Sequence, residues 1–203
     1  MSGPNETLRT IHQRHSVRRF TDQPVSEEHV TALLAAANQA PSAHNQQSWR
    51  FYVLRQSRKK AALADLITAR AADFPRPSST LLRMAAQSIA SASAMIAVAN
   101  TGVLMQRADE LYQSDKQVAR DFFRTMEIQS SAAAVENLLL AATSLGISSV
   151  WLGILILVKH EVLEFLGEPD GEFMAVVALG YPARATSGPR KRALEDVVRY
   201  LDE

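Results

Sequence analysis

Two basic clusters near opposite ends of the chain contain side chains that suit an anionic ligand. They comprise Arg14, His15, Ser16 and Arg18 in the stretch RHSVRRF, and Arg190, Lys191 and Arg192 after a proline near the end. A phosphomonoester carries a charge of about −1.5 to −2 at neutral pH, which convergent arginines and a hydroxyl group match. Taken separately, each cluster is more typical of a solvated surface. Together they predict a phosphate site if the fold brings them close.

A second stretch, PSAHNQQSW at residues 41–49, concentrates neutral hydrogen-bonding side chains and contains no glycine. Turns that only reverse the chain commonly use glycine, often as Asp-Gly. Hydroxyl and amide groups can hold a polar ligand without adding charge to it. The stretch is therefore either a ligand-binding segment or a polar connection between a helix and a strand.

Several familiar catalytic motifs are missing from the chain. There is no GxGxxG, no GxxxxGK[ST] and no cysteine, which excludes thiolate nucleophiles, disulfides and cysteine zinc sites. The nearest approach to a nucleophile elbow, residues 146–150, lacks the final glycine and follows a predicted helix. His12 and His15 have no third ligand at a suitable spacing. The sequence thus predicts neither a protein nucleophile nor a metal site.

The composition indicates a globular protein without an obvious polyanionic partner. Of 203 residues, 47% are hydrophobic and 21% charged, and the net charge is only +1. This balance argues against a protein that coats nucleic acid or an anionic membrane. The N-terminus has no apolar signal-peptide core, and no run approaches the roughly 18 apolar residues of a membrane helix. We expect one cytoplasmic domain spanning residues 1–203.

Hydrophobic periodicity predicts an α+β domain. Strands are expected near 49–54, 95–100, 148–152 and 173–179, with an extended SVRRF segment before the first. Helices are expected at 5–14, from Ser26 onward, at 58–72, 79–92 and 127–145, and in a last helix that ends at Gly167. Gly146 and Gly167 are suited to helix ends. The charged and aromatic segment 102–126 is predicted to be a lid or insertion of helical character.

Four stretches in the same order resemble the nitroreductase family of flavin enzymes. They are RHSVRRF, APSAHNQQSW, AVENLLLAATSLGISSVWLG, and ALGYPAR followed by PRKRALEDVV, and the match in spacing extends from about residue 8 to 199. The resemblance implies a central, mainly antiparallel sheet flanked by helices, in an intertwined homodimer with FMN sites at the interface. It implies that NADH or NADPH reduces the flavin, which then reduces a nitroaromatic, quinone or similar small-molecule acceptor by a ping-pong mechanism. The flavin carries the chemistry, so no catalytic side chain is expected.

The resemblance also implies cofactor-binding roles, segment by segment. The first segment, facing the phosphate, ribityl chain or pyrimidine edge, contains Arg14, His15, Ser16 and Arg18. The segment that the partner subunit contributes contains Pro41, Ser42, Ala43 and Asn45, supported by Gln47. The stretch beside the ring, whose backbone N–H groups reach the reactive nitrogen, contains Trp151, Leu152 and Gly153. Arg190 and Arg192 match the basic pair that closes on the phosphate, with Lys191 as the replacement for either.

Three positions are left open by the resemblance. Ser48 stands where the family usually has proline, which makes the turn before Trp49 less rigid. Relatives direct an Asn and a Lys from the middle of the chain toward the flavin, and the candidates here are Arg83, Gln87 and Ser88. Within 102–126, Tyr112, Phe122 and Phe123 either flank an aromatic acceptor or form dimer contacts.

Three functions remain compatible with the sequence, because fold does not determine function. The first is an NAD(P)H-dependent FMN reductase of nitroaromatic or quinone-like acceptors. The second is a relative that uses the flavin as an oxidase or dehydrogenase in a biosynthetic pathway. The third is a flavin-binding protein without turnover.

Overall fold

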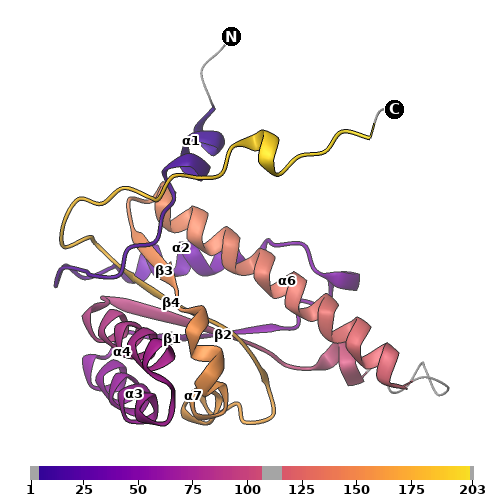
Figure 1. Cartoon of the computed structure of the whole chain (residues 1–203), viewed down its shortest axis with the longest axis horizontal. Helices are drawn as coiled ribbons and strands as arrows, with labels where there is room; N and C mark the ends of the chain where they lie inside the picture. The colour runs from indigo at the N-terminus through magenta and orange to yellow at the C-terminus, as the bar shows by residue number, and fades with distance from the viewer. Residues whose placement is uncertain (1–4, 107–115, 202–203) are drawn as a thin grey trace.

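A four-stranded antiparallel sheet lies at the centre of the computed structural model, which describes residues 5–106 and 116–201 (Figure 1). The strands run in the order β1-β2-β4-β3. Their bounds are Trp49–Leu54 for β1, Ala94–Asn100 for β2, Ser148–Trp151 for β3 and Glu172–Gly180 for β4. Every predicted strand is confirmed, with each end within one residue of its expected position. The predicted α+β class with an antiparallel sheet is likewise confirmed.

Helices cover both faces of this sheet (Figure 1). The α-helices are α1 Glu6–Gln13, α2 Glu27–Asn38, α3 Ser57–Arg70, α4 Arg76–Ser91, α6 Lys116–Ser144 and α7 Lys159–Leu166. Short 3₁₀ turns are η1 Ala43–Asn45, η2 Ala71–Asp73, η3 Gly153–Val158 and η4 Leu194–Asp196. Helices α3, α4 and α7 pack on one face, and α2 and α6 pack on the other. No helix in the described part of the chain is long and apolar enough to cross a membrane.

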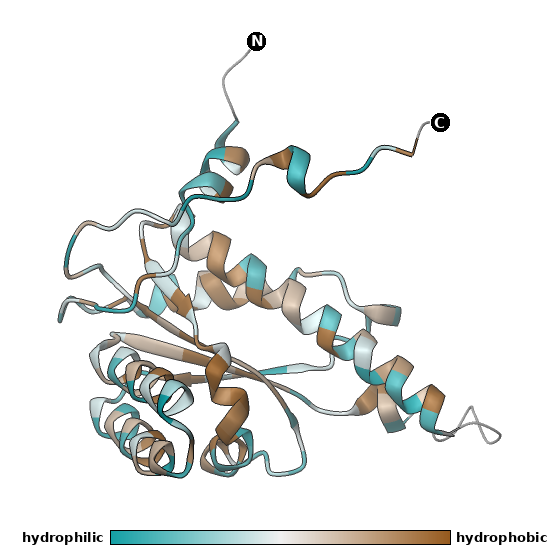
Figure 2. Cartoon of the chain, viewed as in Figure 1, coloured by the Kyte–Doolittle hydropathy of each residue, from teal (hydrophilic) through white to brown (hydrophobic). Residues whose placement is uncertain are grey.

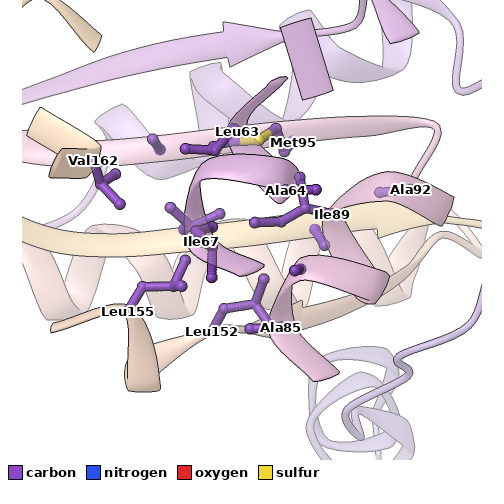
Figure 3. Packing of buried hydrophobic residues seen from close by; sticks show 14 of the residues in the cluster. Leu63, Ala64, Ile67, Ala85, Ile89, Ala92, Met95, Leu152, Leu155 and Val162 are labelled. Carbon is purple, nitrogen blue, oxygen red and sulfur yellow. The ribbon is translucent and has the colours of Figure 1, made fainter. Parts of the chain in front are cut away.

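Strand β2 separates two hydrophobic cores, and all its residues are buried. Because side chains alternate along a strand, Met95 and Ala97 face α3 and α4, whereas Ile96 and Val98 face α2 and α6. Figure 3 shows the first of these cores, in which Met95 lies among side chains of α3 and α4. The continuous apolar run AMIAVA therefore reflects burial on both faces.

Helix α6 begins at Lys116, so the predicted start at residue 127 was wrong. Hydrophilic and hydrophobic residues alternate along its first turns (Figure 2), which hides the apolar stripe in the sequence. Ala119 and Phe123, one helical turn apart, nevertheless pack against buried Leu104 in a small third core. The helical character expected of 102–126 is confirmed for 103–106 and 116–126. Residues 107–115, with Tyr112, lie outside the described residues.

The start of α4 at Arg76 also differs from the predicted 79, since Pro77 is accepted in the first turn of the helix. Three other predicted helix limits rest on capping chemistry that the structure confirms. The Ser26 hydroxyl accepts the His29 N–H at 3.1 Å at the start of α2. Gly146 and Gly167 adopt φ values of +72° and +75° after α6 and α7. This left-handed conformation lets the chain leave a helix at little steric cost when the residue is glycine.

Candidate functional site: a cationic pocket and a distant polar lip

Residues 14–20 extend the β3 edge of the sheet, as the extended SVRRF pattern predicts. Ser16 forms a parallel bridge to Ser149, and the Val17 N–H donates to the Ser149 carbonyl at 2.9 Å. Farther along, Phe20 pairs with Pro182, just after β4. Val17 and Phe20 are buried, which directs Ser16, Arg18 and Arg19 to the surface. The edge thus presents hydroxyl and guanidinium groups on a rigid backbone.

The two basic clusters meet in one pocket of about 280 Å³ beside this edge. Its lining consists of His12, Gln13, Arg14, His15, Ser16, Arg18, Gly188, Pro189 and Lys191. Among the described residues, no Asp or Glu lines the pocket, and neither Arg14 nor Arg18 forms an ion pair. Unpaired cations with a hydroxyl group favour a dianionic ligand such as a phosphomonoester.

His15 fastens the C-terminal segment to the N-terminal one. Its Nδ1 lies 2.8 Å from the Gln13 carbonyl and its Nε2 lies 3.0 Å from the Thr186 hydroxyl. Because a carbonyl only accepts, Nδ1 carries the proton in the neutral ring and Nε2 accepts from Thr186. A Cβ atom on Gly188 would lie 3.0 Å from the His15 Cβ, so glycine permits this close approach. Neither Thr186 nor Gly188 carries a sequence motif that would have indicated this contact.

The structure distinguishes the basic residues of the tail. Lys191, the predicted replacement, lines the pocket, whereas Arg190 and Arg192 do not. The Arg192 guanidinium instead donates to the Asp196 carbonyl at 3.2 Å. A role for Arg190 and Arg192 at the phosphate therefore stays a prediction, and Lys191 is the cation of the tail that the fold brings to the pocket.

Two further pockets continue from Arg18 toward helix α4. One of about 470 Å³ is lined by Arg18, Arg19, Arg184, Met84 and Thr186, among others, and one of about 680 Å³ includes Gln87 and Ser88. Of the three mid-chain candidates, Arg83 lines neither pocket. Ser88 is buried and its hydroxyl donates to the Met84 carbonyl at 3.0 Å. Gln87 is exposed, so its amide is the mid-chain group best placed to reach a ligand.

Residues 151–153 lie at the end of β3, on the same edge of the sheet as residues 14–20. Trp151 is half-buried against the α2–α6 core, and Leu152 is buried in the other core. The Leu152 N–H donates to the Val176 carbonyl at 2.8 Å and is not available to a ligand. Gly153 is exposed and opens η3, and the first N–H groups of a helix have no partner within it. Gly153 therefore has a backbone that suits the predicted role, whereas Leu152 does not.

The polar stretch before β1, which we call the lip (residues 41–48), is held in an unusual backbone conformation. His44, Asn45 and Gln47 have φ values of 52°, 53° and 48°, which non-glycine residues rarely adopt. The Ser42 hydroxyl accepts the Gln47 N–H at 3.1 Å, and the Gln47 amide donates to the Asn45 side-chain oxygen at 3.0 Å. Strained backbone of this kind is frequent at functional sites. Because these positions lack glycine, the lip keeps its side chains although glycine would adopt the same φ values with less strain.

The lip and the cationic pocket lie at diagonally opposite corners of the sheet. The lip leads into β1, at one edge, whereas residues 14–20 lie beyond β3, at the other. Trp49, which follows the lip, pairs with Asn100 at one end of β2, and Ser149 pairs with Leu179 near the opposite end of β4. Adjacent strands are about 4.8 Å apart. One chain therefore does not bring Ser42, Ala43, Asn45 or Gln47 to the pocket.

Gly180→Ala is expected to displace the 14–20 edge. A Cβ atom there would lie 2.9 Å from the Phe20 Cβ, which cannot move without the backbone. Overpacking of this kind costs about 1–3 kcal/mol of unfolding free energy. We also expect weaker binding of any ligand in the cationic pocket, measured by titration with the ligand. Urea unfolding measures the change in stability, and a Gly180→Ala variant as stable as the wild type would contradict this explanation.

The fold and the site define a two-faced α+β domain with an acid-free cationic pocket on one sheet edge. Comparison with known proteins places it in a family: the profile of the nitroreductase family matches residues 11–181. An Archaeoglobus fulgidus protein named as an NADH dehydrogenase/NAD(P)H nitroreductase is 33% identical over 180 residues, which cover 87% of this chain and 86% of that protein. The chain belongs to the nitroreductase family.

Two other relatives bear on the cofactor and the reaction. The crystal structure of a Desulfovibrio desulfuricans nitroreductase in complex with FMN has a TM-score of 0.73 and 30% identity, and the match covers 98% of each chain. The 5,6-dimethylbenzimidazole synthase of Rhodospirillum rubrum is 27% identical over 83% of this chain and 78% of that protein. The family thus contains members named for different reactions.

Proposed function

We propose that the chain is an FMN-dependent oxidoreductase that takes hydride from NADH or NADPH and passes it to a nitroaromatic, quinone or similar electrophilic acceptor. The observation that carries the proposal is the cationic pocket that Arg14, Arg18 and Lys191 form with Ser16, without a carboxylate. This donor set fits the phosphate of FMN. Membership of the nitroreductase family and the FMN complex of a relative support the same cofactor.

Each group at the edge has a task that its position supports. Arg14 and Lys191 hold the phosphate, and the Ser16 hydroxyl donates to it or to the ribityl chain. Arg18 lines all three adjoining pockets, so its charge would serve the pyrimidine edge if the ring lies toward α4, where Gln87 would supply a neutral amide. A positive group near this edge favours the reduced, more negative flavin. Bound FMN supplies the hydride chemistry, and the protein supplies position and charge.

We further propose an intertwined homodimer in which the lip of each chain covers the FMN of its partner. The diagonal separation of lip and pocket supports this arrangement, since a second copy can supply the missing side chains. Helix α1 has no buried residue, although Leu8 and Ile11 are apolar and 47% exposed. The tail likewise exposes Leu194, Val197, Tyr200 and Leu201. Apolar surface of this extent is typical of surfaces that a partner covers.

The acceptor would bind on the flavin face left open beside the lip. Phe122, on the first turns of α6, is 52% exposed and packs edge-on against buried Phe123, with 5.2 Å between ring centroids. An exposed aromatic ring can stack on a flat aromatic acceptor. Whether Phe122 contacts the acceptor or the partner subunit, the proposal predicts that both reactants bind in turn at one site in a ping-pong cycle.

Anaerobic reduction tests the proposed function. Purified protein loaded with FMN should lose the visible absorbance of the oxidised flavin when NADH or NADPH is added. Addition of a nitroaromatic compound or a quinone without oxygen should restore the absorbance. Protein that binds no FMN would contradict the proposal, and so would FMN that neither nicotinamide reduces. Reduction without faster reoxidation by any acceptor would instead support a flavin-binding protein.

A second function is favoured by one observation, the similarity to 5,6-dimethylbenzimidazole synthase. A biosynthetic flavin oxidase or dehydrogenase would use the same phosphate pocket and the same lip. It would differ in the oxidation of its own substrate by the flavin or by oxygen. FMN that stays oxidised with both nicotinamides would favour this alternative over the reductase.

A further inference from the structure

Beneath the lip lies a group of buried polar side chains that the proposed function does not use. Glu127 and Asn100 are 0% exposed and Ser48 is 4% exposed. They come from α6, from the end of β2 and from the lip itself, and Glu172 at the start of β4 lies close enough to influence Glu127. Among the described residues, Ser48 Oγ, Asn100 Nδ2, Glu127 Oε2 and Glu172 Oε2 have no hydrogen-bond partner.

The two carboxyl groups differ in their surroundings. Glu172 pairs with Arg124, one helical turn before Glu127 on α6. Among the described residues, Glu127 forms no ion pair, and its Oε1 accepts the Leu104 N–H at 2.9 Å. Burial raises the pKa of the Glu127 carboxyl and the charge of Glu172 raises it further, whereas the Leu104 N–H and the Ser48 hydroxyl lower it. A buried carboxyl group beside a like charge is most stable when it is protonated.

Glu127 sits where three segments meet. Residues 101–104 contact it through Leu104, and the same residues hold the lip because the Thr101 N–H donates to the Ser48 carbonyl at 2.9 Å. The lip reaches α6 a second time, since the Ala43 N–H donates to the Ser130 hydroxyl at 3.1 Å. Residues 127 and 130 lie on one face of the helix. One end of the lip is thus bonded to α6 at Ser130, and the other end is joined to Glu127 through residues 101–104.

The lip needs this support because its backbone is strained. Left-handed backbone at three non-glycine residues persists only where the surroundings impose it. Of the charged groups around Glu127, Glu172 and Arg124 belong to β4 and α6, and residues 101–106 contain none. The lip contributes His44, which is exposed. Glu127 is therefore the buried group whose ionisation would change the contacts of the lip.

We propose that protonated Glu127 is a positioning residue that holds the lip and residues 101–104 on α6, and that it releases them when it ionises. In the protonated form, Glu127 Oε1 accepts the Leu104 N–H. The Oε2 hydroxyl donates to Ser48 Oγ, which then has a hydrogen-bond partner. In the ionised form, a further negative charge is buried beside Glu172, whose partner Arg124 is already engaged. The proton moves to solvent, and no other group changes its charge. Only the link from the lip to FMN rests on the proposed function.

The sign of the pH effect follows from the raised pKa of Glu127. Because the folded state holds this proton more tightly than the unfolded chain, its stabilising effect is complete below the unfolded pKa and is lost as the pH rises through the folded pKa. Glu127→Gln keeps one acceptor and one donor but cannot ionise. The variant should therefore retain the lip contacts at every pH.

Amide hydrogen exchange of the wild-type protein and Glu127→Gln, compared at the same pH, tests the proposal without FMN. At about pH 5 the Ala43 and Leu104 amides should exchange almost equally in both proteins, and at about pH 8 they should exchange faster in the wild type, because the ionised fraction of Glu127 rises with pH. Equal exchange at both pH values would overturn the proposal. Faster exchange in Glu127→Gln at about pH 5 would also overturn it, because the glutamate would then act only as an anion.

Two further variants test the proposal even if Glu127→Gln does not fold. Ser48→Ala removes the hydroxyl partner, so Ala43 should exchange faster while Leu104, held by the other carboxyl oxygen, does not. Unchanged exchange at Ala43 would contradict the proposal. Glu136→Gln replaces an exposed glutamate of the same helix and should behave like the wild type. A pH response of Glu136→Gln like that of Glu127→Gln would show that the effect comes from the loss of any negative charge on α6, and not from Glu127 in particular.

Titration with FMN tests whether the state of Glu127 affects cofactor binding. The Kd of the wild-type protein for FMN should rise relative to that of Glu127→Gln between about pH 5 and about pH 8, in parallel with the loss of lip protection. Parallel Kd values in the two proteins would show that the lip does not depend on Glu127. If neither protein binds FMN, the proposed function fails, and hydrogen exchange still decides the role of Glu127.

Discussion

The Arg14→Ala/Lys191→Ala variant is expected to bind FMN about 10²- to 10⁴-fold more weakly than the wild type, because each hydrogen bond to a charged group contributes about 1.5–3 kcal/mol. Both side chains line the acid-free pocket, where no neighbouring cation of the tail replaces Lys191. Riboflavin, which lacks the phosphate, should bind the variant and the wild type almost equally. Fluorescence titration with both ligands therefore measures the phosphate contribution alone.

The Arg190→Ala/Arg192→Ala variant is the matched comparison. It removes the same number of positive charges from nearly the same place, but from side chains outside the pocket lining. We expect a loss of FMN affinity smaller than about tenfold, caused by the weaker long-range field. A larger loss here than in Arg14→Ala/Lys191→Ala would show that the tail closes differently on the phosphate. An equal loss of riboflavin affinity in either variant would instead indicate a folding defect.

The strands could be predicted from sequence because each is a short run with buried apolar residues between turn-forming or polar segments. β2 and β4 are buried on both faces, so their continuous apolar runs leave little ambiguity about their limits. The start of α6 could not be predicted in the same way. Its first turns bury only Ala119 and Phe123, against a segment that precedes them by more than a dozen residues. Hydrophobic periodicity reveals a helix when several buried residues recur along one face, and the first turns of α6 have only two of them.

The candidate site could be predicted only in part, for reasons of distance along the chain. The two basic clusters are visible as clusters, but the contact that joins them runs from His15 to Thr186 and depends on a glycine at 188. Neither residue type signals a contact by itself. The structure also separates Lys191 from its arginine neighbours, which differ only in the direction that an irregular backbone gives them.

Ser48 shows how an unusual residue can gain meaning from a distant partner. Where the family resemblance implies proline, serine makes the turn before β1 less rigid. In the fold, Ser48 is buried beside Glu127 and its carbonyl accepts the Thr101 N–H. Side-chain and backbone contacts therefore replace the covalent restraint of a proline ring. The sequence alone contained both residues, 79 positions apart, and nothing in it linked them.

Mixing two defective variants is expected to restore about a quarter of the wild-type activity if the lip acts on the partner's cofactor. One variant, Arg14→Ala/Arg18→Ala, disables the pocket, and the other, Ser42→Ala/Asn45→Ala, disables the lip. Each should be impaired alone, the lip variant by about 10- to 100-fold if each hydrogen bond contributes about 1 kcal/mol. Half of the randomly formed dimers are then mixed, and each mixed dimer combines both defects in one site and leaves the other intact.

The alternative arrangement predicts a different result from the same mixture. If lip and pocket of one site came from a single chain, every site in a mixed dimer would carry one of the two defects, and the activity would stay at the mean of the two variants. The measurement is the acceptor-dependent oxidation of NADH or NADPH after the variants are refolded together, with separately refolded samples mixed afterwards as the control. Recovery only after joint refolding would require both exchange of subunits and a shared site. This outcome follows from a sheet that keeps Ser42 and Asn45 at one corner and Arg14 and Arg18 at the opposite one.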